Sequence, residues 1–233
     1  ELGFEYNLSS TIKATGAAAY GEYTFDNNPN LKVNDDAQAS DTNTNPVFDF
    51  GKAYLKNYRV AGMPQQAYSL GLEYRAPQFW WIGANANYLA DSYIDVSSIT
   101  RTNNFTIAPG GGNSTFDGLT DAELRRVLKQ EKFDPVTLVN LVGGKSWKIK
   151  NNTFGFFASI NNVFDITYKT GGFEQSRKAT YPDYLADNST QVLLDPANPA
   201  NGAIQLDSAQ PSFGPKYFYG YGRTYFVNFY INF

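Results

Sequence analysis

RTYFVNFYINF, residues 223–233, is the last segment of the sequence, and from Tyr225 onward every second residue in it is apolar. Successive side chains of a β-strand point to opposite faces, so this alternation predicts a strand with one apolar face. The same period extends back to position 217 and gives a predicted strand over 217–233. The predicted apolar face carries Tyr217, Tyr219, Tyr221, Tyr225, Val227, Phe229, Ile231 and Phe233, with Arg223 as its exception.

An aromatic strand that ends on a phenylalanine is typical of the closing strand of an outer-membrane β-barrel, which places aromatic residues at the membrane interface. We therefore expect Phe233, Ile231, Phe229 and Tyr225 to form a barrel-assembly signal, with Phe233 at the periplasmic end. A tilted strand crosses the bilayer in roughly 9 to 11 residues. Arg223 is then expected at the outer edge of the membrane, where a cation can meet anionic headgroups.

The composition agrees with a membrane protein that crosses with strands. The 233 residues contain 18 Phe, 17 Tyr and 3 Trp but no Cys and no His, and the formal net charge is -3. No run approaches the 18 or so consecutive apolar residues of a transmembrane helix, so any membrane span must be β. The acidic balance argues against a nucleic-acid partner. The chain starts at Glu1, without an initiator Met or a signal peptide, and we expect a fragment of a longer protein.

Period-two alternation predicts seven strands along the chain. The clearest pattern places Tyr68, Leu70, Leu72 and Tyr74 on one face of a single strand. Lys145 shares the apolar face of the fifth strand, whose register is therefore the least secure, and Asn162 interrupts the sixth strand, which suggests a bulge. The predicted strands are about 1–9, 12–25, 66–75, 79–94, 136–149, 153–167 and 217–233.

The predicted connections alternate between short and long. Short turns fall at Ser9-Ser10, Ala76-Pro77-Gln78 and Lys150-Asn151-Asn152. Long loops fall at about 26–65, 95–135 and 168–216, the first with a short strand predicted around 53–60. The second contains a capping box, Thr120-Asp121-Ala122-Glu123, and Leu124, Val127 and Leu128 at helical spacing, so it predicts a short helix.

This alternation is typical of outer-membrane barrels, in which short turns are periplasmic and long loops extracellular. With Phe233 at the periplasmic side, every short turn falls in the periplasm. Seven strands are an odd number, and the first has no predecessor to pair with, which leaves an edge that a membrane would not tolerate. The sequence thus predicts an all-β, transmembrane antiparallel β-barrel protein, of which this chain is the C-terminal segment.

Several motifs add a family resemblance. They are Gly143-Gly144-Lys145-Ser146-Trp147, Ile160-Asn161-Asn162-Val163-Phe164-Asp165 leading to Tyr168, Gly171-Gly172-Phe173-Glu174-Gln175-Ser176-Arg177, and Tyr219-Gly220-Tyr221-Gly222-Arg223-Thr224-Tyr225. With these motifs the chain resembles the C-terminal third of TonB-dependent outer-membrane receptors. It is most similar to the branch whose members carry an N-terminal carboxypeptidase-regulatory-like domain.

The resemblance implies a 22-stranded barrel filled by an N-terminal plug, which takes up scarce substrates across the Gram-negative outer membrane. This chain would supply the last seven strands. Its expected partners are the remainder of the barrel, the plug domain, TonB through the absent N-terminal region, outer-membrane lipid and lipopolysaccharide, and the barrel-assembly machinery. Siderophores, vitamins, oligosaccharides and peptides all pass through related barrels, and no loop motif selects one of them.

The residues argue against an enzyme and against a bound cofactor or metal. Without His or Cys, Ser-His-Asp and Cys-His catalysis and the usual zinc sites are excluded. Paired carboxylates, Asp35-Asp36 and Glu131 near Asp134, lie in predicted loops, where solvated charges are the simpler interpretation. The run 41–45, DTNTN, starts like a calcium loop, but Pro46 stands where that loop needs glycine and Lys52 where it needs glutamate.

The candidate binding residues are polar side chains on the inner face of the predicted barrel and aromatic residues in its loops. Asp91 with Tyr93, and Asn87 and Asn85, are candidates for lining the lumen or the substrate vestibule. Glu73 and Arg75 lie near the periplasmic end and are candidates for plug contacts. The loop aromatics suited to ligand capture are Phe105, Phe116, Phe173, Tyr181 and Tyr184.

Two other functions remain compatible with the sequence. A passive porin-type channel would also be a barrel, but without a plug. A soluble β-sandwich adhesin or carbohydrate-binding module would need no detergent, whereas apolar stripes on at least five strands predict aggregation outside detergent or lipid.

Overall fold

The computed structural model describes residues 1–34, 46–106, 121–174, 192–195, 198–204 and 215–233, together with 39, 180 and 181. Several features named above lie outside these residues. They are Asp35-Asp36, the run 41–45, Phe116, Thr120, Tyr184 and the segment Gln175-Ser176-Arg177.

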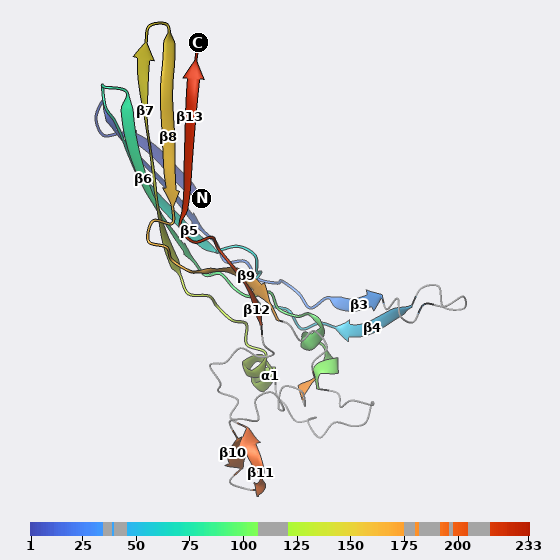
Figure 1. The fold of residues 1–233 in the computed structure, drawn as a ribbon. Helices are drawn as coiled ribbons and strands as arrows, with labels where there is room; N and C mark the ends of the chain where they lie inside the picture. The colour runs from blue at the N-terminus through green and yellow to red at the C-terminus, as the bar shows by residue number, and fades with distance from the viewer. Residues whose placement is uncertain are drawn as a thin grey trace.

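The described residues are dominated by one antiparallel sheet of seven strands, which confirms the all-β class (Figure 1). The order in the sheet is β1-β2-β5-β6-β7-β8-β13, so each strand pairs with the strand of this sheet that follows it along the chain. Among the described strands, β1 and β13 each pair on one side only, so the sheet is open rather than closed into a barrel. The strands are β1 Leu2–Asn7, β2 Ile12–Tyr20, β5 Gln66–Arg75, β6 Trp80–Ala90, β7 Val136–Ile149, β8 Asn152–Asn161 and β13 Thr224–Asn232.

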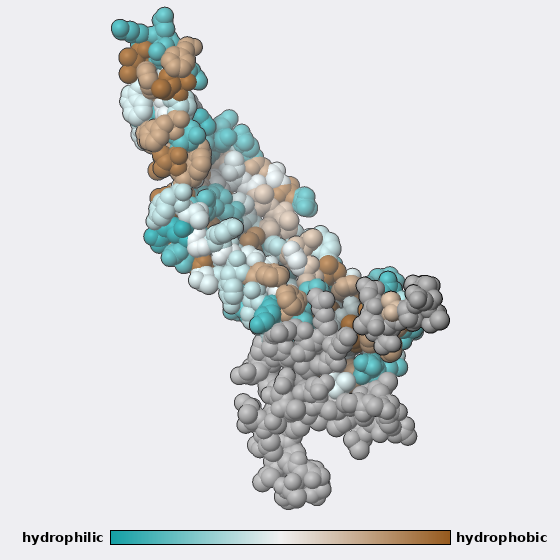
Figure 2. Space-filling model, turned by 45° about the vertical axis from the view of Figure 1, so that its right-hand side comes forward, coloured by the Kyte–Doolittle hydropathy of each residue, from teal (hydrophilic) through white to brown (hydrophobic). Residues whose placement is uncertain are grey.

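The register joins the apolar stripes of all seven strands into one face. Residues directly opposite each other in paired strands point to the same side of a sheet. One such row crosses the sheet from Tyr6 to Tyr225 through Ala14, Leu72, Ala84, Leu141 and Ile160. The predicted faces of these strands are therefore confirmed. Figure 2 shows hydrophobic side chains exposed along the sheet, beneath a hydrophilic cap where β7 turns into β8.

Lys145 does lie on the apolar face, and the register of β7 that places it there is confirmed. It pairs with Trp80 on one side and with Phe156 on the other. Its Nζ is 5.7 Å from the centroid of the Trp147 ring and donates to the carbonyl oxygen of Gln78 at 3.5 Å. The ammonium group thus reaches toward the short-turn end, as long basic side chains do beside apolar surfaces.

The smaller elements gather at the opposite end of the sheet from the short turns and the C-terminus (Figure 1). In the part of the chain that the structure describes, three two-stranded sheets pair β3 with β4, β9 with β12 and β10 with β11. None of the helices in the described residues is long and apolar enough to cross a membrane. The elements are β3 Asn30–Asn34, β4 Val47–Lys52, η2 Ile99–Arg101, η3 Asn103–Phe105, α1 Asp121–Val127, β9 Lys169–Phe173, β10 Val192–Asp195, β11 Asn198–Ile204 and β12 Lys216–Tyr219. The helix predicted from the capping box is confirmed as α1.

The first long connection differs from the prediction. The strand predicted over 53–60 is wrong, because Asn57 adopts a left-handed backbone with φ of 72° and breaks it. The predicted strand over 12–25 ends at Tyr20, where Gly21 donates its N–H to the Gln65 carbonyl, at 2.8 Å. Beyond this strand, Phe25 donates its N–H to the Tyr58 carbonyl at 2.9 Å. The segments around Phe25 and Tyr58 thus meet outside the large sheet.

The strand predicted over 153–167 ends at Asn161, and the bulge expected at Asn162 is a turn. Asn162 has φ of 50° and is 4% exposed, and Asp165 has φ of 56°. Asn tolerates this left-handed conformation better than most residues because its side chain can bond locally. Here the Asn162 side chain bonds both the N–H (2.9 Å) and the carbonyl (2.8 Å) of Ile166.

The strand predicted over 217–233 is two strands in two different sheets. β12 pairs with β9, whereas β13 pairs with β8. The junction is fixed by the turn after β8, because Asp165 Oδ1 accepts the N–H of Arg223 at 2.7 Å and Asn162 Nδ2 donates to the Tyr221 carbonyl at 3.2 Å. Gly220 lies under the ring of Tyr168, where a Cβ atom would collide with the ring. Alternation alone does not reveal this change of partner, because both strands keep the same period.

Candidate ligand-binding cavity among the long connections

Two glutamines join the first two long connections, Gln65 through its backbone and Gln130 through its side chain. Gln65 is 3% exposed; its Nε2 donates to the Tyr23 carbonyl at 2.9 Å, and its backbone N–H donates to the Asp91 carbonyl at 3.2 Å. Gln130 pairs with the backbone of Arg59, accepting its N–H at 2.8 Å and donating to its carbonyl at 2.9 Å, and also donates to the Ile94 carbonyl at 2.7 Å. Such bonds satisfy buried backbone groups that a loop would otherwise leave unpaired.

A buried ion pair joins the third connection to the second. The side chain of Arg101 is 1% exposed and that of Glu174 is 7% exposed. Arg101 Nη2 donates to Glu174 Oε1 at 2.7 Å, and Arg101 Nη1 donates to Glu174 Oε2. Glu174 Oε2 also accepts the N–H of Ser97 at 3.0 Å. Burial by itself lowers the pKa of Arg101, but the facing carboxylate outweighs it, so the pKa lies above its ordinary value.

Tyr58 ties this ion pair to the segment that follows α1. Its ring centroid lies 5.0 Å from the Arg101 guanidinium carbon, and its hydroxyl donates to the Leu128 carbonyl at 3.0 Å. Arg101 Nη2 donates to the same carbonyl at 2.9 Å. Arg125 also contacts Tyr58: its guanidinium carbon lies 5.4 Å from the Tyr58 ring centroid. Its Nη2 donates to the Lys56 carbonyl at 3.1 Å.

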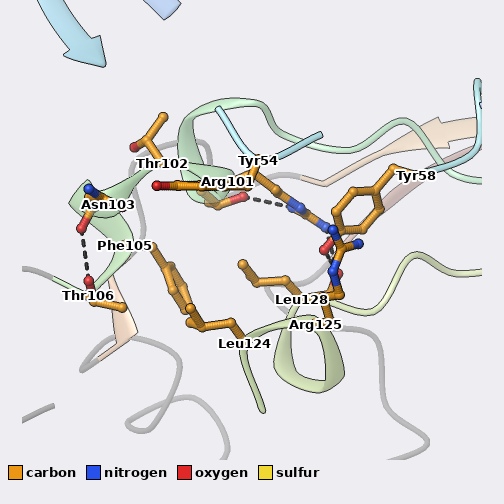
Figure 3. Close-up of a pocket in the computed structure, with 11 residues that line it drawn as sticks. Tyr54, Tyr58, Arg101, Thr102, Asn103, Phe105, Thr106, Leu124, Arg125 and Leu128 are labelled. Carbon is orange, nitrogen blue, oxygen red and sulfur yellow. Dashed lines mark hydrogen bonds between the residues drawn. The ribbon is translucent and has the colours of Figure 1, made fainter. Parts of the chain in front are cut away.

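These residues form the wall of a cavity of about 260 Å³. Figure 3 shows Phe105, Leu124 and Leu128 converging on one space, with Arg125 beside the Tyr58 ring at its edge. The cavity therefore combines an apolar floor with a cation at one end and hydroxyl groups around it. Its lining is Tyr54, Tyr58, Thr100, Arg101, Thr102, Asn103, Phe105, Thr106, Leu124, Arg125 and Leu128.

Asp91 and Tyr93 lie where β6 enters the second long connection, away from this cavity. Asp91 forms an ion pair with Lys132 and accepts a hydrogen bond from Gln66 Nε2 at 2.7 Å. The hydrogen bond from Lys132 holds the pKa of Asp91 below its usual value. The Tyr93 ring centroid is 5.8 Å from the guanidinium carbon of Arg59. Both candidates thus hold the loop in place.

The other polar candidates lie on the face of the sheet opposite the apolar one. Asn85 pairs with Gly71 and Asn140, and Asn87 pairs with Ser69 and Leu138. Glu73 and Arg75 bond each other at 2.6 Å. The Arg75 guanidinium carbon lies 5.5 Å from the Trp81 ring centroid, and Lys13 stands opposite Glu73 in the register. The structure does not bring these residues together with Asp91 or with the cavity.

Among the loop aromatics, Phe105 is brought to the cavity. It is 1% exposed and its ring centroid is 6.0 Å from that of Tyr181. Phe173 lies in β9, where its ring centroid is 5.9 Å from that of Phe218. The remaining candidates, Tyr225, Phe229, Ile231 and Phe233, lie on the exposed apolar side of the β13 edge, and Phe229 is 78% exposed.

Glu131, one of the carboxylates considered as a pair with Asp134, bonds two residues of the third long connection. Its Oε1 accepts from Lys169 Nζ at 2.7 Å and its Oε2 accepts from the Tyr217 hydroxyl at 2.7 Å. Burial, and then this hydrogen bond, raises the pKa of Tyr217. Within the part of the chain that the structure describes, no cluster of three or more potential metal-ligating side chains occurs.

The sequence reasoning missed the residues that organise the cavity: Arg101, Glu174, Tyr58 and Arg125. One signal pointed to Glu174, because it belongs to the glycine-rich element 171–175 that carried part of the resemblance. Nothing in the local pattern pairs Glu174 with Arg101, since 73 positions separate them.

Comparison with protein-family models, with curated proteins and with solved structures found no match. The geometry alone therefore defines the class: an antiparallel β-protein with one exposed apolar sheet face and a layer of packed long connections at one end.

Proposed function

We propose that this chain is the C-terminal part of the barrel wall of a TonB-dependent receptor, which takes up a scarce substrate across the outer membrane of a Gram-negative cell. In this proposal the apolar face of the sheet contacts lipid. The long connections face outward and contribute to substrate capture. The chain itself carries out no chemistry.

The observation that carries the proposal is the order of side chains along the apolar face. Tyrosine and tryptophan gather near both ends of the strands, and between them lie aliphatic residues together with Phe4. Such aromatic girdles around an aliphatic band are what a bilayer selects, because amphipathic rings favour the headgroup region. Near the short turns lie Tyr6, Tyr74, Trp80 and Trp147, near the long connections lie Tyr68, Tyr88 and Tyr225, and between them lie Leu70, Leu72, Ile82, Ala84, Ala86, Leu141, Ala158 and Val227.

The exposure and the lengths of the strands fit the same environment. Leu70 is 65% exposed and Leu72 is 58% exposed, and their neighbours across the sheet are also apolar. An apolar face that spans seven strands is far larger than the patches that soluble monomers leave uncovered. β5 has 10 residues and β6 has 11, the length that a tilted strand needs to cross a bilayer.

The open edges support a larger barrel. In the described residues, β1 and β13 each lack a partner strand on their outer side. A bilayer offers no water to satisfy the backbone groups of such an edge, so further strands must pair there if the sheet lies in a membrane. The resemblance suggests a 22-stranded barrel with a plug, which Glu73 and Arg75 would approach from the inner face. TonB, lipopolysaccharide and the barrel-assembly machinery are the partners that this proposal implies.

Two neighbouring tryptophans test the lipid contact directly. Trp80 lies on the apolar face, and Trp81 lies on the opposite face of the same strand. In the complete barrel that contains this chain, with every tryptophan outside the chain replaced by phenylalanine and the protein reconstituted in vesicles, we expect lipid with brominated acyl chains to quench Trp80 strongly and Trp81 weakly. The matched variants are Trp81→Phe with Trp147→Phe, which leaves Trp80, and Trp80→Phe with Trp147→Phe, which leaves Trp81.

Equal quenching of the two tryptophans would contradict the proposal, as would a monomeric chain that needs neither detergent nor lipid. The latter result would favour the soluble adhesin or carbohydrate-binding module. A passive channel would keep the quenching pattern but would make vesicles permeable to the substrate without an energy source.

A further inference from the structure

We infer that the cavity between η3 and α1 is a binding site for a small organic anion, a carboxylate attached to an apolar or aromatic body. The first argument is shape and lining. Phe105, Leu124 and Leu128 supply an apolar surface, and the volume of about 260 Å³ suits a small molecule or one end of a larger one.

The second argument is charge. Two cations line the cavity, Arg101 and Arg125, and among the described side chains that line it none is acidic. Glu174 neutralises Arg101, but Arg125 forms no ion pair in the part of the chain that the structure describes. To the described residues, only one of the five guanidinium N–H groups of Arg125 donates, in the bond to the Lys56 carbonyl. The remaining donors and the planar group suit a carboxylate, which an arginine binds with two parallel hydrogen bonds.

The third argument is an unsatisfied donor. Arg101 Nε is buried and has no hydrogen-bond partner, which is true of no other buried side-chain nitrogen or oxygen in the described residues. A buried donor without an acceptor is costly, and such groups are rare in folded proteins. An acceptor atom held in the cavity beside Arg101 would satisfy it, so this argument points to an oxygen-bearing ligand independently of Arg125.

The site does not depend on membrane location. As part of the proposed receptor it would take the carboxylate end of the substrate, and that extension alone rests on the proposed function. The quenching experiment tests membrane location, whereas ligand binding is measured separately, so failure of one is distinguishable from failure of the other.

The test uses 3-phenylpropionate as the probe and the uncharged 3-phenylpropanamide as its match, titrated calorimetrically into the whole purified chain. We expect saturable binding of the anion and roughly tenfold weaker binding of the amide, because the amide lacks the charge-assisted pair. Arg125→Gln should remove this preference, and Arg125→Lys should keep part of it. Arg126→Gln is the control, because Arg126 is exposed and does not line the cavity.

Three results would overturn the inference: no saturable binding of 3-phenylpropionate, equal affinity for the amide, or an equal loss in Arg126→Gln. Circular dichroism of each variant separates loss of binding from loss of folding. Should Arg125→Gln fail to fold, the comparison of the anion with the amide on the unmodified chain still decides the question.

Discussion

Glu174 holds two of the long connections together. It is the counter-ion of a guanidinium group whose side chain is 1% exposed, and it also accepts the N–H of Ser97. Taking two charges out of water is costly, and the pair offsets this cost only while both partners are present. The pair therefore specifies which loops meet more than it adds stability.

We expect Glu174→Gln to lower the free energy of unfolding by about 3–5 kcal/mol, because Arg101 is then a buried cation without a counter-ion. Denaturant unfolding in detergent, followed by tryptophan fluorescence, measures this. The double replacement Arg101→Met with Glu174→Leu should recover most of the loss. A single variant as stable as the unmodified chain would show that the pair is not buried in solution.

At the scale of elements, the turn after β8 decides how the closing strand enters the sheet. Asn162 bonds Ile166 and Tyr221, and Asp165 bonds Arg223 immediately before β13. The turn thus holds the chain at the point where it leaves β12, which is paired with β9, and joins β13, which is paired with β8. The structure gives a physical role to the Asn-Val-Phe-Asp motif, which the sequence marks only through resemblance.

We expect Asn162→Ala to destabilise the fold by about 2–4 kcal/mol, because it removes buried hydrogen bonds and puts a Cβ atom at a left-handed position. Asn162→Gly should be about 1 kcal/mol less harmful, since glycine adopts φ of 50° without strain. Thermal unfolding monitored by circular dichroism compares them. Asn161→Ala is the control, because Asn161 is exposed and makes one long side-chain bond, at 3.3 Å, to Thr224. If alanine and glycine behave alike, the backbone conformation is not what matters.

At the scale of the whole molecule, the sheet has two faces of different character, and Leu70 and Ser69 point to opposite ones. If the apolar face contacts lipid, a cation at Leu70 must enter the hydrocarbon. We expect Leu70→Arg to reduce folding into vesicles by about 2–4 kcal/mol, and Ser69→Arg to have a small effect. The fraction of folded protein, read from electrophoretic mobility without heating, reports the difference. Improved solubility of Leu70→Arg with unchanged folding would oppose a lipid contact.

The faces and the order of the seven main strands were predictable, because period-two alternation and short turns are local properties of the sequence. Lys145 shows how far this reasoning extends: its place on the apolar face was predicted, and the pairs with Trp80 and Phe156 confirm it. The cavity was not predictable, since Arg101 and Glu174 are 73 positions apart and neither belongs to a periodic pattern.

By itself, the sequence determined an antiparallel all-β chain with one apolar face and with long connections at one end. The reason is that side-chain direction in a strand depends only on position along it, and a turn depends only on a few adjacent residues. Only the tertiary structure decided that 217–233 is two strands in two sheets and that Asn162 forms a turn. It also decided that Arg101, Tyr58 and Arg125 line one cavity, with Glu174 paired to Arg101. These features depend on contacts between segments far apart in the chain, and the free energy of burying charges and backbone groups selects them.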